Sequence, residues 1–74
     1  MEYRQNYDYI GVIELDNGAY YHVVKYASDN GFYLDAGSAT NTCFLSSYRF
    51  EFDNDDNIDV ALSDLYERIL EDQQ

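Results

Sequence analysis

Residues 15–35 read LDNGAYYHVVKYASDNGFYLD, and this stretch contains the clearest strand and turn signals of the chain. Two Asp-Asn-Gly triplets in it separate segments that are rich in Tyr, Val and Phe. Asn-Gly favours the positive φ angles of a two-residue type I′ turn, whereas aromatic and β-branched residues favour strands. The pattern therefore predicts a hairpin and then a short third strand. The predicted strands cover residues 7–15, 19–27 and 32–35.

The next segment, AGSATNT at 36–42, contains small and polar residues without an apolar period, which predicts a loop. A fourth strand is predicted from 43 to 52. Side chains alternate between the two faces of a strand, so this strand is expected to have one apolar and one charged face. The apolar face is predicted to carry Phe44, Tyr48, Phe50 and Phe52, and the charged face Arg49, Glu51 and Asp53.

Apolar residues change to a helical period near the end of the chain. Ile58, Leu62, Leu65 and Ile69 recur at this spacing and predict one amphipathic helix over 57–71. A sheet and a helix in so short a chain hide their apolar faces most simply against each other. The predicted fold class is α+β, a four-stranded antiparallel meander-type sheet with one C-terminal amphipathic helix packed on one face. We expect a single small domain over residues 1–74.

Charge limits the classes of partner. Fifteen acids against four Lys and Arg residues give a formal net charge of −11, which repels nucleic acids and anionic membranes. We therefore expect neither direct nucleic-acid binding nor membrane association. A membrane span of about 18 apolar residues and a basic-then-apolar N-terminal signal are both lacking, so we expect a cytoplasmic location. The single cysteine, Cys43, excludes an internal disulfide and a thiolate-rich zinc site.

The stretch EFDNDDNID at 51–59 contains five acids and no base, and three interpretations of it remain open. The first is a cation-binding loop at Asp53, Asp55, Asn57 and Asp59, which alternate like the first ligands of an EF-hand. That match breaks later, because Ile58 stands where the EF-hand needs glycine and Asp64 where it needs glutamate. The second is a helix start with Asp56 or Asn57 as the N-cap.

The third interpretation is an acidic surface for a basic partner. Residues 51–74 hold nine acids and one base. Acids two apart on a strand lie roughly 6 to 7 Å apart, and those three or four apart on a helix about 5 to 6 Å. These distances are comparable to the spacing of successive phosphates along a nucleic acid. Such a surface can compete for a basic groove, although acids on a small protein also serve solubility.

Nine tyrosines are more than one small core can bury. Exposed tyrosines beside acids suit a binding surface, but they also suit cross-strand pairing on a solvated sheet face. A homodimer formed through that face or through a strand edge would use them as well. His22 has no second histidine, and the pair Cys43 and His22 lacks an orienting third group, so we expect no enzymatic activity and no cofactor.

By size and charge alone, the chain is similar to the small acidic inhibitors that bacteriophages and mobile elements use against host nucleic-acid enzymes, including anti-CRISPR proteins and DNA mimics. We therefore expect a non-enzymatic interaction domain that occupies a basic protein surface. The alternatives are a dimeric accessory domain whose charge serves solubility and the acidic cation-binding loop. The predicted partner-binding residues are Glu51, Asp53, Asp55, Asp56, Asp59, Asp64, Glu67, Glu71, Tyr48 and Tyr66.

Overall fold

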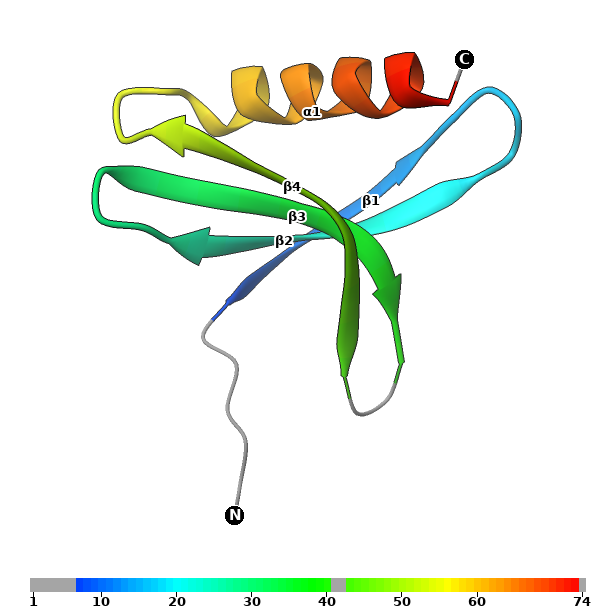
Figure 1. Ribbon diagram of the computed structural model, residues 1–74, viewed down its shortest axis with the longest axis horizontal. Coiled ribbons are helices and arrows are strands. Elements are labelled where there is room, and N and C mark those ends of the chain that lie inside the picture. Colours follow the sequence, from blue (N-terminus) through cyan, green and yellow to red (C-terminus); the bar gives the residue numbers. More distant parts are fainter. Residues whose placement is uncertain (1–6, 41–42, 74) are drawn as a thin grey trace.

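Four strands and one helix make up the computed structural model, which describes residues 7–40 and 43–73. The elements are β1 (Asp8–Glu14), β2 (Tyr20–Ala27), β3 (Gly31–Ala39), β4 (Phe44–Asp53) and α1 (Ile58–Asp72). Neighbouring strands pair antiparallel in the order β1-β2-β3-β4. Figure 1 shows α1 along one face of the twisted sheet, while the other face carries no helix. The predicted α+β fold with a meander sheet is confirmed.

The turn between β1 and β2 differs from the predicted type. A type I′ turn needs positive φ at both central residues, yet Gly11 and Gly18 are the only described residues with positive φ. Leu15 N donates to Ala19 O and Gly18 N donates to Leu15 O, as in a three-residue loop that ends on a left-handed glycine. Asn17 acts through its side chain, whose Oδ1 accepts from Ala19 N at 2.9 Å. The predicted hairpin is confirmed, but the two-residue type I′ turn was wrong.

The third strand is longer than predicted, because it continues through the first half of the expected 36–42 loop to Ala39. Residues 41–42 of that loop lie outside the described residues. Gly37 is buried, and a Cβ atom there would collide with the carbonyl oxygen of Leu45 in β4. Glycine in a strand often marks a close approach of two backbones. The absence of a side chain at Gly37, which suggested a loop, therefore allows β4 to approach β3 closely.

A β-bulge in β4 reverses the alternation of its side chains. The register with β3 shifts between Tyr48 and Ser46, which leaves Ser47 as the extra residue. An insertion of one residue moves the side chains beyond it to the other face of the sheet. Phe44 therefore lies on the other face of the sheet from Tyr48, Phe50 and Phe52. Its ring packs on that of Tyr7, with the ring centroids 6.1 Å apart. The predicted common face was wrong for Phe44.

The main core lies between α1 and the sheet. Leu34 from β3 and Leu65 and Ile69 from α1 are completely buried, and burial of side chains of this size stabilises by about 1.5 to 3 kcal/mol each. The helix end is held by Gln73, whose amide group bonds Tyr21 OH at 2.5 Å and Asn17 Nδ2 at 3.2 Å. Helix α1 is thus fixed both by its apolar stripe and by the β1–β2 hairpin. In the described part of the chain, no helix is long and apolar enough to cross a membrane.

Candidate protein-interaction site

Two of the predicted acids project from the sheet face that α1 leaves uncovered. Glu51 pairs with Tyr33 and Asp53 with Gly31 across the β3–β4 ladder. These β3 residues alternate with Leu34, which belongs to the core beneath α1. Both acids are exposed. The charged face predicted for the fourth strand is therefore the uncovered face, at the edge of the sheet.

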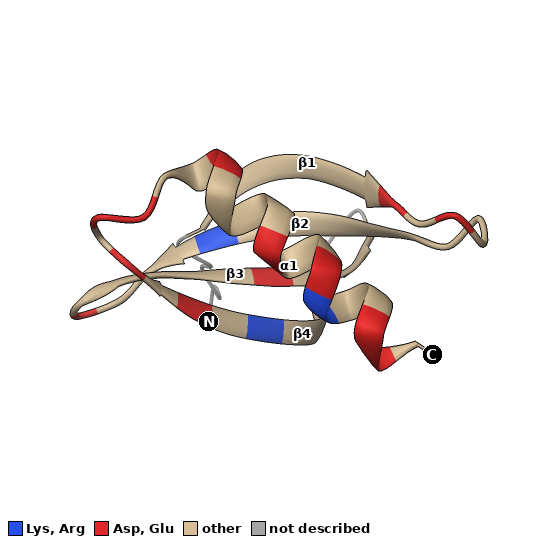
Figure 2. Cartoon of the chain, turned by 90° about the horizontal axis from the view of Figure 1, so that it is seen from above, with Lys and Arg blue, Asp and Glu red and all other residues tan. Residues whose placement is uncertain are grey.

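A second group of acids lies on the outer side of α1. Helical spacing places Asp64, Glu67 and Glu71 opposite the buried stripe of α1, and Figure 2 shows acidic bands along this helix. Asp64 forms an ion pair with Arg68 one turn later, with Nε and Oδ2 2.9 Å apart. The predicted acidic residues thus occupy two surfaces, one on each side of the β4 edge.

The turn that joins β4 to α1 connects these two surfaces. Asp56 Oδ2 accepts a hydrogen bond from Asp53 N at 3.0 Å, and Asn57 Oδ1 accepts one from Asp59 N at 2.7 Å. Asn57 is therefore the N-cap, as one of the two alternatives predicted. Asp59 lies in the first helical turn, where a carboxylate suits the positive end of the helix dipole. Asp55 is exposed at the tip.

The cation-binding alternative requires Asp53, Asp55, Asn57 and Asp59 to converge. Asn57 uses its side-chain oxygen for the helix cap. Across 7–40 and 43–73, no three or more His, Cys, Asp or Glu side chains are grouped so that they could hold a metal ion. The aspartates of this stretch serve turn geometry and surface charge instead of forming one ligand set.

The two tyrosines of the predicted site lie on the side of α1. Tyr48 OH donates to Asp72 Oδ2 at 2.7 Å, and its ring meets Tyr21 edge-on at 5.7 Å. The hydrogen bond to Asp72 raises the pKa of Tyr48 above its ordinary value, with smaller contributions from burial and from the charge of Asp72. Tyr66 packs against the core from the helix itself. Both residues thus help to hold α1 on the sheet.

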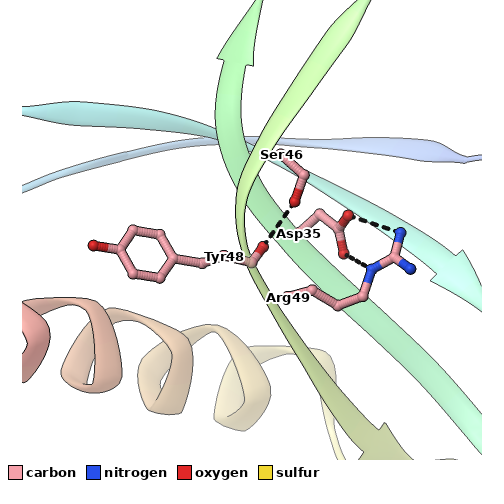
Figure 3. A network of polar contacts seen from close by, with 4 residues as sticks. All are labelled: Asp35, Ser46, Tyr48 and Arg49. Atoms are coloured by element: carbon pink, nitrogen blue, oxygen red, sulfur yellow. Dashed lines mark hydrogen bonds and ion pairs between the residues drawn. The ribbon is translucent and has the colours of Figure 1, made fainter.

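An ion pair on the uncovered face was missed from the sequence. Arg49 Nε and Nη2 donate to the two carboxylate oxygens of Asp35 at 2.9 and 3.0 Å (Figure 3). The side chain of Asp35 is 1% exposed and that of Arg49 53%. Asp35 and Arg49 are direct cross-strand partners, so only the correct β3–β4 register reveals them. The pair raises the pKa of Arg49, chiefly through its hydrogen bonds with Asp35.

Aromatic rings cover the outer side of this ion pair. The guanidinium carbon of Arg49 lies 5.1 Å from the centre of the Tyr26 ring and 5.0 Å from that of Tyr33. Tyr26 in turn meets Tyr7 edge-on at 5.5 Å. Cation–π contacts and a buried carboxylate together fix Arg49 in one position. This half of the uncovered face therefore forms a small second core of its own.

The other half of the uncovered face is open. Tyr9, Val12 and Tyr20 are 57, 51 and 62% exposed, and the register of β1 and β2 places all three around His22. We call these four residues the aromatic patch. His22 Nδ1 and Tyr9 OH are 2.9 Å apart, and the ring of His22 lies 5.9 Å from each of the two tyrosine rings. Exposed aromatic residues in a group are typical of binding surfaces.

A hollow of about 390 Å³ adjoins the aromatic patch. It is lined by Tyr20 and His22 of β2 and by Gly37, Ser38 and Ala39 of β3. Gly37 has no side chain to fill the space, because β4 approaches too closely for one. A larger hollow of about 500 Å³ lies at the opposite end of β2, around Lys25 and Phe32. Sequence reasoning identified neither, since both depend on strand register.

The two residues considered for nucleophilic chemistry have other contacts. His22 bonds Tyr9, as described above, whereas Cys43 is exposed at the end of the β3–β4 hairpin. Cys43 N donates to Thr40 Oγ1 at 3.1 Å, and this hydroxyl donates back to Cys43 O at 3.1 Å. These bonds close the hairpin.

Comparison with known proteins finds no matching family model, no matching curated protein and no matching solved structure.

Proposed function

We propose that this chain is a non-enzymatic interaction domain that binds the basic surface of another protein. Its partner is a nucleic-acid enzyme, and the chain acts by occupying the surface that would otherwise hold nucleic acid. An inhibitor made by a phage or mobile element in the bacterial cytoplasm would have these properties. The proposal rests on acids that the fold leaves exposed and, with one exception, without a cation beside them among residues 7–40 and 43–73.

The observation that carries the proposal is the distribution of ion pairs. In residues 7–40 and 43–73 the ion pairs are Asp35 with Arg49 and Asp64 with Arg68. Of the eight predicted partner-binding acids, Asp64 is therefore the one that has a cation beside it within this range. The other seven are exposed at the edge of β4, in the following turn and on α1, and have no ion pair within this range. A basic partner would complete these pairs.

Geometry supports a partner with a groove. The acids follow one path from the uncovered face, around the end of β4 and along α1 (Figure 2). Charges on both sides of an edge suit a concave basic surface that receives the edge, as a nucleic-acid channel does. Complementary charge mainly increases the rate of association and the specificity, and its effect weakens with salt.

The experiment is a pull-down from a nuclease-treated bacterial lysate with the tagged full chain, eluted by rising salt and analysed by mass spectrometry. The test variant carries Glu51→Gln, Asp53→Asn and Asp55→Asn. A matched control carries Asp8→Asn, Asp16→Asn and Asp29→Asn, which are also exposed. Each triple removes three acids from a net charge of −11 and leaves −8.

We expect one basic nucleic-acid enzyme to be captured by the parent chain and by the control, and to be lost with the test variant. Equal loss with both variants would mean that only total charge matters. Capture by the test variant at unchanged salt would contradict the proposal, because the acids at the β4 edge would then contribute nothing to binding.

A dimeric accessory domain is the second candidate, and the open sheet favours it. Strands β1 and β4 each pair on one side only, and an unpaired edge can bind the same edge of a second copy. Sedimentation equilibrium between 10 and 500 μM tests this candidate. A mass that doubles with concentration supports it, and a constant monomer mass removes it.

A further inference from the structure

Each cation in the described part of the chain lies over an aromatic ring. Arg49 lies against Tyr26 and Tyr33, as described above. Lys25 Nζ is 5.1 Å from the centre of the Phe32 ring, and the guanidinium carbon of Arg68 is 5.0 Å from that of Phe50. The protein therefore uses its own few cations to cover rings. Arg49 and Arg68 also each pair with a carboxylate, that of Asp35 and that of Asp64, so both sites combine a ring, a cation and an acid.

The aromatic patch and the neighbouring Glu14 provide a ring and a carboxylate, with no cation from the described residues between them. Tyr20 offers a ring face, and Glu14, its direct partner on β1, places a carboxylate on the same face of the sheet. Residues directly opposite each other on adjacent strands have Cβ atoms about 4.5 to 5.5 Å apart. Glu14 is exposed and has no ion pair within 7–40 and 43–73. The rings of Tyr9 and Tyr20 contact His22 there, while the cations of the described residues lie over other rings.

The hollow beside the patch provides room for a side chain. Its volume of about 390 Å³ is at the lower end of the range of about 300 to 1,000 Å³ that is typical of ligand pockets. Gly37, Ser38 and Ala39 of β3 line it together with Tyr20 and His22. The carboxylate of Glu14, beside Tyr20 on β1, is a hydrogen-bond acceptor, so these surroundings suit a donor with several N–H groups.

We infer that this hollow receives an arginine side chain from the basic partner. The guanidinium plane stacks on the Tyr20 ring, and its N–H groups bond the carboxylate of Glu14, the partner of Tyr20 on β1. The inference rests on the proposed function and names the residue type that would give binding its specificity. Arginine suits the site better than lysine, because a planar guanidinium both stacks on rings and binds a carboxylate through two hydrogen bonds. The net charge of −11 disfavours a second copy as the occupant.

The test is an NMR titration of the ¹⁵N-labelled full chain with an acetylated, amidated hexa-arginine peptide in 150 mM NaCl. We expect saturable shifts at the backbone amides of His22 and Gly37. Tyr20→Leu removes the ring from an exposed position and should weaken binding about three- to tenfold, the size of an exposed or partly desolvated cation–π contact. Glu14→Gln should weaken it as well, and this conservative variant guards against a folding defect in the first.

Two controls separate charge from recognition. Asp64→Asn, Glu67→Gln and Glu71→Gln together remove charge from α1, and the loss on Tyr20→Leu should persist in this background. Hexa-lysine carries equal charge and should bind the hollow more weakly than hexa-arginine. Equal affinity of the two peptides together with no effect of Tyr20→Leu would overturn the inference.

Failure of the inference differs from failure of the proposed function. Shifts confined to the acids of β4, the following turn and α1, unaffected by Tyr20→Leu and Glu14→Gln, would overturn the arginine site and leave the acidic surface intact. The absence of any saturable shift would contradict both.

Discussion

The two faces of the sheet reach burial by different means. The covered face packs Leu34 against Leu65 and Ile69 of α1 in an apolar core. The uncovered face has no helix, yet Val24 and Asp35 on it are buried, beneath Arg49 and its neighbouring rings. A strand pattern with one apolar face therefore underestimates how much of the second sheet face is buried. Its second face is half a small core and half an open aromatic surface, and the open half is available for function.

The two Asp–Arg pairs illustrate the same difference. Both have an Nε-to-oxygen distance of 2.9 Å. Asp64 and Arg68 lie four residues apart on α1 and both are substantially exposed, so water competes for them. Asp35 has lost its water, so it depends on Arg49. Equal distances thus correspond to different energies.

The covered face should give the largest effect. Leu65→Ala removes a completely buried side chain from the centre of α1, and such substitutions lower the free energy of unfolding by about 2 to 5 kcal/mol. Urea denaturation followed by circular dichroism measures this. The control is Val60→Ala on the exposed side of the same helix, which should change stability by at most about 0.5 kcal/mol. Similar effects of the two would mean that α1 does not form the main core.

The Arg49–Asp35 pair in the second core, on the uncovered face, should give the next largest loss of stability. Arg49→Met keeps the bulk of the side chain and leaves the Asp35 carboxylate without its cation. We expect a loss of about 2 to 3 kcal/mol, less than for a fully enclosed pair, because Arg49 is half exposed and water can enter. Adding Asp35→Leu should recover most of the loss, since the uncompensated charge is then removed. A single Arg49→Met variant as stable as the parent would show that the uncovered face has no core.

The helix docking contact of Tyr48 predicts a pH dependence. Its pKa is raised in the folded protein, mainly by the hydrogen bond to Asp72, so this contribution is complete below the ordinary tyrosine pKa of 10.0. It is lost as pH rises through the folded pKa. Tyr48→Phe should reduce stability by about 0.5 to 1 kcal/mol at pH 7, and its difference from the parent should shrink above pH 10. Tyr20→Phe, with no contact to α1, serves as the control in parallel urea titrations. A difference that stays constant to pH 11 would contradict this role.

The surface pair should give the smallest effect. Arg68→Met breaks the pair with Asp64, which is worth about 0.3 to 0.5 kcal/mol for an exposed i,i+4 pair. The comparison with Arg49→Met, the same substitution in the other pair, isolates the effect of burial. Raising NaCl from 50 mM to 1 M should abolish the small Arg68 effect and leave most of the Arg49 effect, because screening acts mainly on exposed charges. Equal salt dependence would refute the distinction between the two pairs.

Local patterns predicted the element order, the helix and the Asn57 cap, because turn residues, apolar period and capping chemistry are properties of neighbouring residues. Local patterns failed where the structure depends on contacts between two strands that are distant in the sequence. Gly37 was assigned to a loop because its need for close approach to β4 is visible only in three dimensions, and the bulge at Ser47 moved Phe44 to the other face for the same reason.

The candidate site was predictable to a similar extent. The high proportion of acids in residues 51–74 was enough to predict an exposed acidic surface, since the exposure of these acids hardly depends on strand register. Tyr48 and Tyr66 could not be separated from exposed tyrosines, because composition does not show which face a ring occupies. The aromatic patch and its hollow require the β1–β2 and β2–β3 registers together.

Competition between this chain and nucleic acid for the captured enzyme would show whether the acidic residues occupy its nucleic-acid site. Fluorescence anisotropy of a labelled duplex oligonucleotide bound to that enzyme would be followed while the parent chain is added. We expect full displacement of the oligonucleotide by the parent and by the Asp8, Asp16 and Asp29 control, with a weakened effect from the Glu51, Asp53 and Asp55 variant. Simultaneous binding of the enzyme to the chain and to the oligonucleotide, with anisotropy unchanged or increased, would contradict this expectation.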